Sequence, residues 1–231
     1  MLVILNNKNH LKKDEFVSYI NDLSSIKSNS FILCPSACYL SLCQDMNFEL
    51  GGQNVSRNNE ESLTGEITAE QLKSLDVSYC LVGHSERRVN LHETSQDINC
   101  KLKSLLAEKI TPILCIGETE TEYKENRTKE VLLKEIQEAI ENISYADQQK
   151  IIIAYEPIWA IENDIIPSPS EITSIIKFIK SIFPSNIIVY GGGINEDNIM
   201  DITSIPILDG LLLGRLSCNS TTLKNIIQRI G

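Results

Sequence analysis

Eight short runs of β-prone residues, separated by stretches with helical character, set the strongest limit on what this chain can fold into. The runs consist mainly of Ile, Val and Leu and do not alternate with polar residues, which is typical of parallel strands covered on both faces. The expected strands are Leu2–Leu5, Ser30–Cys34, Phe48–Gly51, Tyr79–Val82, Pro112–Ile116, Ile151–Ala154, Ile187–Tyr190 and Gly210–Leu213.

Amphipathic patterns predict helices at Asp14–Leu23, Ser95–Leu106, Thr128–Ile143 and Pro169–Ile182, and at Thr221–Ile230 after the last strand. Eight strands with helices between them fit a closed (β/α)8 barrel. The competing layout is an open doubly wound sheet, which needs a Gly-rich turn where this chain has Asn6-Asn7-Lys8-Asn9. The 231 residues show no linker or break in composition, and α/β barrels commonly take roughly 200–250 residues as one domain. We therefore expect an α/β protein with a single (β/α)8 barrel domain over residues 1–231.

Two of the expected strands are followed by residues suited to proton transfer. Glu156 stands between an apolar strand and Pro157, which ends the strand, and His84 comes shortly after Tyr79–Val82. Taken singly, each residue also has a structural interpretation, as a carboxylate that caps a nearby N–H or as a hydrogen-bonded histidine. Together, at the strand ends where sites in such barrels lie, they favour general acid–base chemistry.

Six segments resemble those of the triosephosphate isomerase family and occur in that family's order. They are Gly51–Val55, Thr64–Thr68, Val82–Arg88, Cys115–Glu118, Ala154–Ile161 and Tyr190–Ile194. One such segment would indicate little, whereas six in order span nearly the whole chain. The resemblance implies a barrel enzyme of glycolysis and gluconeogenesis that needs no cofactor and no metal. It would interconvert dihydroxyacetone phosphate and D-glyceraldehyde 3-phosphate through an enediolate.

The resemblance also implies catalytic roles for matching residues. Glu156 would carry the proton between two substrate carbons, and His84 would act as a neutral hydrogen-bond donor at the start of a polar turn. Lys8 would stabilise the enediolate and the phosphate, with Glu86 as its partner. Asn6 would be a polar contact, since alternation along an extended segment puts it on the same side as Lys8.

Phosphate would be bound by backbone N–H groups in the loops after the last two strands, near Gly193 and Gly214. Several residues depart from the family pattern in this region. Gly193 stands where the family has serine, Arg215 where it has glycine, and Asn7 where it has tryptophan. Glu162 replaces a lid glycine whose N–H meets the phosphate, so we expect both Glu162 and Arg215 to line the substrate site with opposite charges.

A polar loop at Ser56–Thr64 resembles the loop that reaches into the partner subunit in this family, so the resemblance implies a homodimer. Two other functions stay open from the sequence. One is a related barrel isomerase that acts on another sugar phosphate, which the rewritten lid would support. The other is a non-catalytic barrel, which would predict loss of Glu156, His84 or Lys8, yet all three are present.

The formal net charge of −10 and the pI near 4.9 argue against nucleic acid or an anionic membrane as partners. No apolar stretch approaches the roughly 20 residues of a membrane span. The seven cysteines include no C-x-x-C pair, and we interpret them as reduced thiols of a cytoplasmic protein. A metal site formed by Cys34, Cys38 and Cys43 is the alternative, although no histidine lies near them in the sequence.

Overall fold

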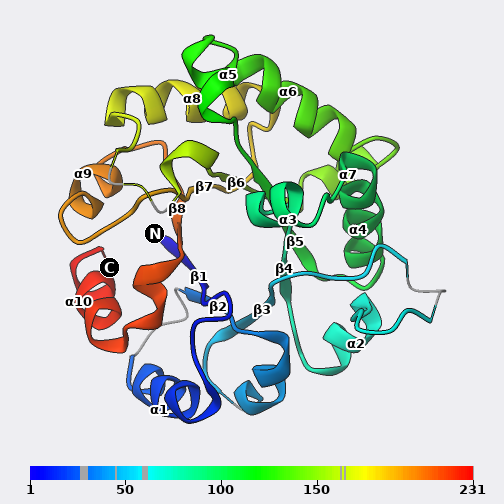
Figure 1. Cartoon of the computed structure of the whole chain (residues 1–231), viewed down its shortest axis with the longest axis vertical. Coiled ribbons are helices and arrows are strands. Elements are labelled where there is room, and N and C mark those ends of the chain that lie inside the picture. Colours follow the sequence, from blue (N-terminus) through cyan, green and yellow to red (C-terminus); the bar gives the residue numbers. More distant parts are fainter. Residues whose placement is uncertain (27–30, 45, 59–61, 162, 164, 231) are drawn as a thin grey trace.

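The computed structural model describes residues 1–26, 31–44, 46–58, 62–161, 163 and 165–230. Eight parallel strands close into a barrel in the order of the sequence, and helices surround it (Figure 1). The expected (β/α)8 barrel is therefore confirmed. The strands are β1 (Leu2–Asn6), β2 (Phe31–Cys34), β3 (Glu49–Gly52), β4 (Tyr79–Val82), β5 (Thr111–Ile116), β6 (Ile152–Tyr155), β7 (Ile188–Tyr190) and β8 (Gly210–Leu213).

The outer layer consists of helices whose apolar faces pack on the barrel. Thr94 and Ser168 cap two of them through capping boxes, as is usual for a Ser or Thr just before a helix. The expected helix Thr128–Ile143 ends earlier, at Ala139, and the chain then turns through Asn142, whose φ is +57°. The α-helices are α1 (Lys13–Ser24), α2 (Ala69–Ser74), α3 (Ser85–Asn90), α4 (Ser95–Ala107), α5 (Glu120–Lys124), α6 (Thr128–Ala139), α7 (Tyr145–Gln148), α8 (Pro169–Ile182), α9 (Ile199–Thr203) and α10 (Ser220–Ile230). Among the described residues there are also three 3-10 helices: η1 (Ala37–Cys43), η2 (Ile158–Ala160) and η3 (Arg215–Cys218).

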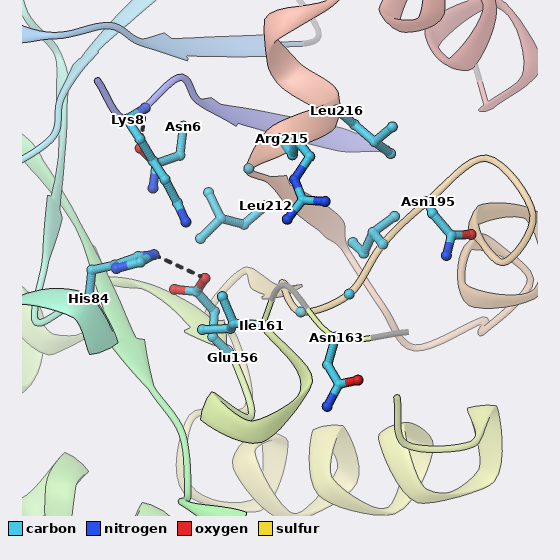
Figure 2. A pocket seen from close by; sticks show the side chains of 14 residues that line it. Asn6, Lys8, His84, Glu156, Ile161, Asn163, Asn195, Leu212, Arg215 and Leu216 are labelled. Atoms are coloured by element: carbon cyan, nitrogen blue, oxygen red, sulfur yellow. Dashed lines mark hydrogen bonds and ion pairs between the residues drawn. The ribbon is translucent and has the colours of Figure 1, made fainter. Parts of the chain in front are cut away.

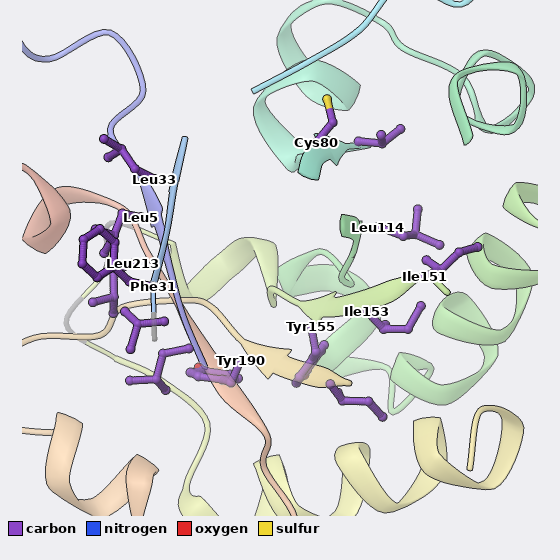
Figure 3. Close-up of a cluster of buried hydrophobic side chains, with 14 of the residues drawn as sticks. Leu5, Phe31, Leu33, Cys80, Leu114, Ile151, Ile153, Tyr155, Tyr190 and Leu213 are labelled. Atoms are coloured by element: carbon purple, nitrogen blue, oxygen red, sulfur yellow. The ribbon is translucent and has the colours of Figure 1, made fainter. Parts of the chain in front are cut away.

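Alternate residues of the strands divide the core into two regions. Inside the barrel lie Ile4, Ile32, Cys34, Leu81, Ile113, Cys115, Ile152, Ala154, Val189 and Leu212. The residues between them, such as Leu5, Ile153 and Leu213, pack outward in the layer between barrel and helices (Figure 3). Because side chains alternate along a strand, the residue two positions beyond Ile4 or Ala154 also points inward. These residues are Asn6 and Glu156, at the carboxyl end of the barrel.

The barrel closes through a seam between its first and last strands. Leu2 pairs with Gly210, and Leu5 pairs with Leu213. The first pair requires glycine, since a Cβ on Gly210 would lie 2.3 Å from the carbonyl oxygen of Leu2. The two ends of the sequence are therefore joined at the seam.

The cysteines are all free thiols. Cys34 lies inside the barrel, Cys43 packs in the outer layer and Cys38 is exposed, so the three residues of the alternative metal site occupy different environments. Among the described residues, no group of three His, Cys, Asp or Glu side chains is placed to hold a metal ion. Within the same part of the chain, no helix combines the length and apolar character needed to cross a bilayer.

Candidate active site

Polar side chains from several strand ends meet at the carboxyl mouth of the barrel (Figure 2). Asn6 ends β1, Lys8 follows it, His84 follows β4 and Glu156 follows β6. One pocket is lined by these four residues and by Gly193, Gly214 and Arg215. Glu86 lies behind Lys8 and pairs with it. Glu162, expected at this site from the sequence, lies outside the described residues.

Glu156 is a buried carboxylate that faces a histidine. Its backbone N–H donates to the carbonyl of Ile116 at 2.8 Å, which fixes the chain at the point where Pro157 ends the strand. Only 7% of the side chain is exposed, and its Oε2 lies 3.6 Å from Nε2 of His84. The other oxygen, Oε1, is buried and has no hydrogen-bond partner among the described residues.

His84 is held in one orientation by the helix that it caps. Its Nδ1 accepts a hydrogen bond from the backbone N–H of Glu86 at 3.3 Å, in the first turn of α3. The carboxylate Oε2 of Glu86 is farther from Nδ1, at 3.7 Å. A ring nitrogen that accepts an N–H carries no proton, so the geometry assigns the ring proton to Nε2, the nitrogen that faces Glu156. This arrangement is that of a neutral imidazole able to donate into the pocket.

Lys8 has a backbone conformation that its neighbours hold in place. Its φ is +50°, in the left-handed region that is uncommon for residues other than glycine. Its carbonyl accepts from Ser36 Oγ and Gln53 Nε2, both at 2.8 Å, and its N–H donates to Asn6 Oδ1 at 3.2 Å. Its Nζ lies 2.5 Å from Glu86 Oε1. These contacts keep the ammonium at the pocket wall despite the unfavourable φ.

The loop after β7 has no space for a side chain at Gly193. Its φ is +58°, and a Cβ there would lie 2.3 Å from Ile166 Cγ2 and 2.8 Å from the carbonyl oxygens of Ala160 and Asn163. Asn198 holds the same loop from the other side, because its Nδ2 donates to the Gly193 carbonyl at 2.9 Å. The glycine thus allows Ala160, Asn163 and Ile166 to pack directly on the loop.

Sequence reasoning assigned no role to Glu118, Gln53 or Ser36. Glu118 is fully buried next to the base of the segment that follows β6. Its Oε1 accepts from Tyr155 Oη at 3.2 Å and from Trp159 Nε1 at 3.0 Å. The available signals were its place at the end of an apolar run and within Cys115–Glu118, one of the six segments that resemble the family. Burial raises the pKa of Glu118 above its ordinary value, and its hydrogen bonds oppose this rise without cancelling it.

Replacing Glu118 with glutamine should make folding stability less sensitive to pH. Because the folded-state pKa of Glu118 is raised, wild-type stability is lost as the pH rises from about 4.5, the ordinary value, through the raised value. The amide keeps the oxygen that accepts from Trp159 and does not titrate. Urea midpoints between pH 4 and 8 should therefore fall further with pH in the wild type than in Glu118→Gln. The matched control is Glu138→Gln on the exposed face of α6, and parallel curves for Glu118→Gln and the wild type would contradict the prediction.

The fold and the site together define a barrel enzyme of acid–base chemistry, with carboxylate, imidazole and ammonium groups around one pocket. A model of the triosephosphate isomerase family matches residues 1–230. The triosephosphate isomerase of Mycoplasmopsis pulmonis is 36% identical over 94% of this chain and 92% of its own length. Those of Orientia tsutsugamushi and Photorhabdus laumondii are 35% and 32% identical, over 99% and 97% of this chain and 97% and 92% of their own lengths. The chain belongs to the triosephosphate isomerase family and is an isomerase.

Proposed function

We propose that this isomerase interconverts dihydroxyacetone phosphate and D-glyceraldehyde 3-phosphate through an enediolate, with Glu156 as the base. The observation that carries the proposal is the 3.6 Å distance between Glu156 Oε2 and His84 Nε2, both on buried side chains in the pocket that Lys8 also lines. The alternative of a non-catalytic barrel does not explain why a carboxylate, an imidazole and an ammonium group line the same pocket.

In the proposed mechanism, Glu156 removes a proton from the carbon next to the substrate carbonyl. The electron pair moves toward the carbonyl oxygen and produces an enediolate. Through Nε2 of His84, the former carbonyl oxygen gains a proton and the hydroxyl of the first carbon loses one. The protonated Glu156 then returns its proton to the adjacent carbon, and the first carbon becomes the aldehyde. His84 donates its Nε2 hydrogen to the oxygen where negative charge develops, and the ammonium of Lys8 stabilises that charge. The proton that leaves one carbon is replaced at the next, so no cofactor or metal is required for balance.

We propose that the phosphate group of the substrate lies against the loops that follow β7 and β8. Gly193 and Gly214 are the backbone donors, and both line the pocket that contains Glu156. Asn6 is a polar contact on the inner face of β1, where it also orients the backbone N–H of Lys8.

The test is turnover by the purified protein in D2O. Dihydroxyacetone phosphate should be converted to glyceraldehyde 3-phosphate, with deuterium incorporated at the carbon that Glu156 protonates. A higher kcat/KM for a tetrose or pentose phosphate would favour the related barrel isomerase. An absence of turnover and of exchange with both substrates would favour the non-catalytic barrel.

We propose further that two copies of the chain form a homodimer through the loop 56–64, of which residues 59–61 lie outside the described residues. A second hollow beside the site is lined by Lys8, Glu86, Gly65 and Leu91, and Leu91 is 62% exposed. An open hollow with an exposed leucine at its edge suits contact with a second copy of the chain, which would cover both. Sedimentation at micromolar concentration should give a dimer, and a fully active monomer would reject the proposal.

We place the protein in the cytoplasm, a proposal supported by its free thiols.

A further inference from the structure

Arg215 carries a positive charge at the edge of the pocket. It follows Gly214, opens the η3 turn and lines the same pocket as Glu156. Figure 2 shows its guanidinium pointing into the pocket. Within the described ranges, no hydrogen bond or ion pair involves this guanidinium, whereas the ammonium of Lys8 is paired with Glu86. Arg215 therefore offers donors that no described acceptor uses.

The η3 turn is fixed to the loop that carries Lys8. Asn7 is 2% exposed, and its Nδ2 lies 3.1 Å from Ser217 Oγ and 3.2 Å from the Ser217 carbonyl oxygen. The same amide lies 3.4 Å from Tyr19 Oη, and the thiol of Cys218 donates to the Asn7 carbonyl at 3.6 Å. A single buried amide thus joins the loop after β1 to the turn that begins at Arg215.

We infer that Arg215 is a substrate-binding residue that holds the phosphate group through its guanidinium, and that Asn7 is the residue that positions it. The inference rests on the proposed function, because it assigns Arg215 to the phosphate of that substrate. The planar fork of a guanidinium matches two phosphate oxygens at once, which a lysine cannot do. In a chain with a net charge of −10, a positive group at the mouth also offsets the repulsion of an incoming dianion.

The first experiment compares Arg215→Gln with Arg229→Gln, since each removes one positive charge and Arg229 lies exposed in the last turn of α10. The probe is inorganic phosphate, titrated against the protein by calorimetry. Arg215→Gln should weaken phosphate binding and raise KM by about tenfold each, with a smaller change in kcat, because the contact is made in both ground and transition states. Arg215→Lys should recover only part of the loss.

Phosphate affinity and KM within twofold of wild type in Arg215→Gln would overturn the inference, as would equal losses in Arg229→Gln. Phosphate titration requires no turnover, so its outcome is independent of whether the isomerase assay succeeds. If the wild type shows no turnover but its phosphate binding depends on Arg215, the proposed function is rejected. The inferred contact between Arg215 and phosphate is then still supported.

The second experiment tests the positioning role of Asn7. Asn7→Ala should raise KM several-fold in the wild-type background and leave KM nearly unchanged in the Arg215→Gln background, because the two residues act through one contact. If Asn7→Ala does not fold, Ser217→Ala replaces it, since that change removes one acceptor of the same amide. Equal KM effects in the two backgrounds would show that Asn7 does not act through Arg215.

Discussion

Glu156→Asp should lower kcat about 100-fold and change KM much less, because shortening the side chain by one methylene withdraws the carboxylate by roughly 1 Å. The backbone N–H of Glu156 donates to the Ile116 carbonyl at 2.8 Å. Because this bond fixes the backbone, the shorter carboxylate of aspartate cannot move closer to the substrate. Glu156→Gln removes the base altogether and should cost on the order of 10³–10⁴-fold in kcat. Steady-state kinetics in both directions of the reaction measure these values.

The control for both Glu156 variants is the titration with inorganic phosphate. The affinity of each variant for inorganic phosphate should stay within twofold of the wild-type affinity, because the carboxylate is not part of the proposed phosphate site. Turnover within a few-fold of wild type in both variants would eliminate Glu156 as the base. A simultaneous loss of phosphate affinity would point instead to damage of the pocket.

His84→Gln should reduce kcat by about 10²–10³-fold, the usual cost of removing one donor to a developing oxyanion. Glutamine is flexible and is not fixed by the N–H of Glu86, whereas the imidazole is oriented by a 3.3 Å hydrogen bond at Nδ1. His92→Gln is the matched control, since His92 is exposed and should give an unchanged kcat.

The protonation of His84 can be measured separately from turnover. Nitrogen NMR at pH 7 should show a bare Nδ1 and a protonated Nε2, because Nδ1 accepts from the Glu86 backbone. A ring that carries protons on both nitrogens at this pH would contradict the neutral-donor mechanism, even if His84→Gln were inactive.

The fold was predictable because each strand is marked by a short run of apolar, β-prone residues that are neighbours in the sequence. Ile and Val runs such as Ile152–Ala154 and Ile188–Tyr190 identify buried parallel strands, and Pro157 marks where one of them ends. Side-chain alternation then points Glu156 inward, and the structure places it opposite His84. The boundaries were less accurate. β3 runs from Glu49 to Gly52, one residue later at each end than the expected Phe48–Gly51.

The supporting contacts could not be predicted, because each joins segments that only the closed barrel brings together. Gln53 holds the carbonyl of Lys8, and Asn7 reaches Ser217 near the other end of the sequence. Nothing next to Asn7 in the sequence distinguishes a buried amide anchor from a surface asparagine. Likewise, the need for glycine at residue 193 depends on Ile166 and on the carbonyl of Ala160, whose positions the local sequence does not specify.

The β1–β8 seam makes the order of synthesis important for this protein. β1 leaves the ribosome first, yet one of its two edges stays unpaired until Gly210–Leu213 has been made. Lys8 follows one strand of the seam and Gly214 the other, so the pocket is completed only when the seam closes. Contacts so distant in sequence form late, because closing a long loop costs entropy. A chain that stops before β8 should therefore be inactive, and its open strand edge should make it prone to aggregate.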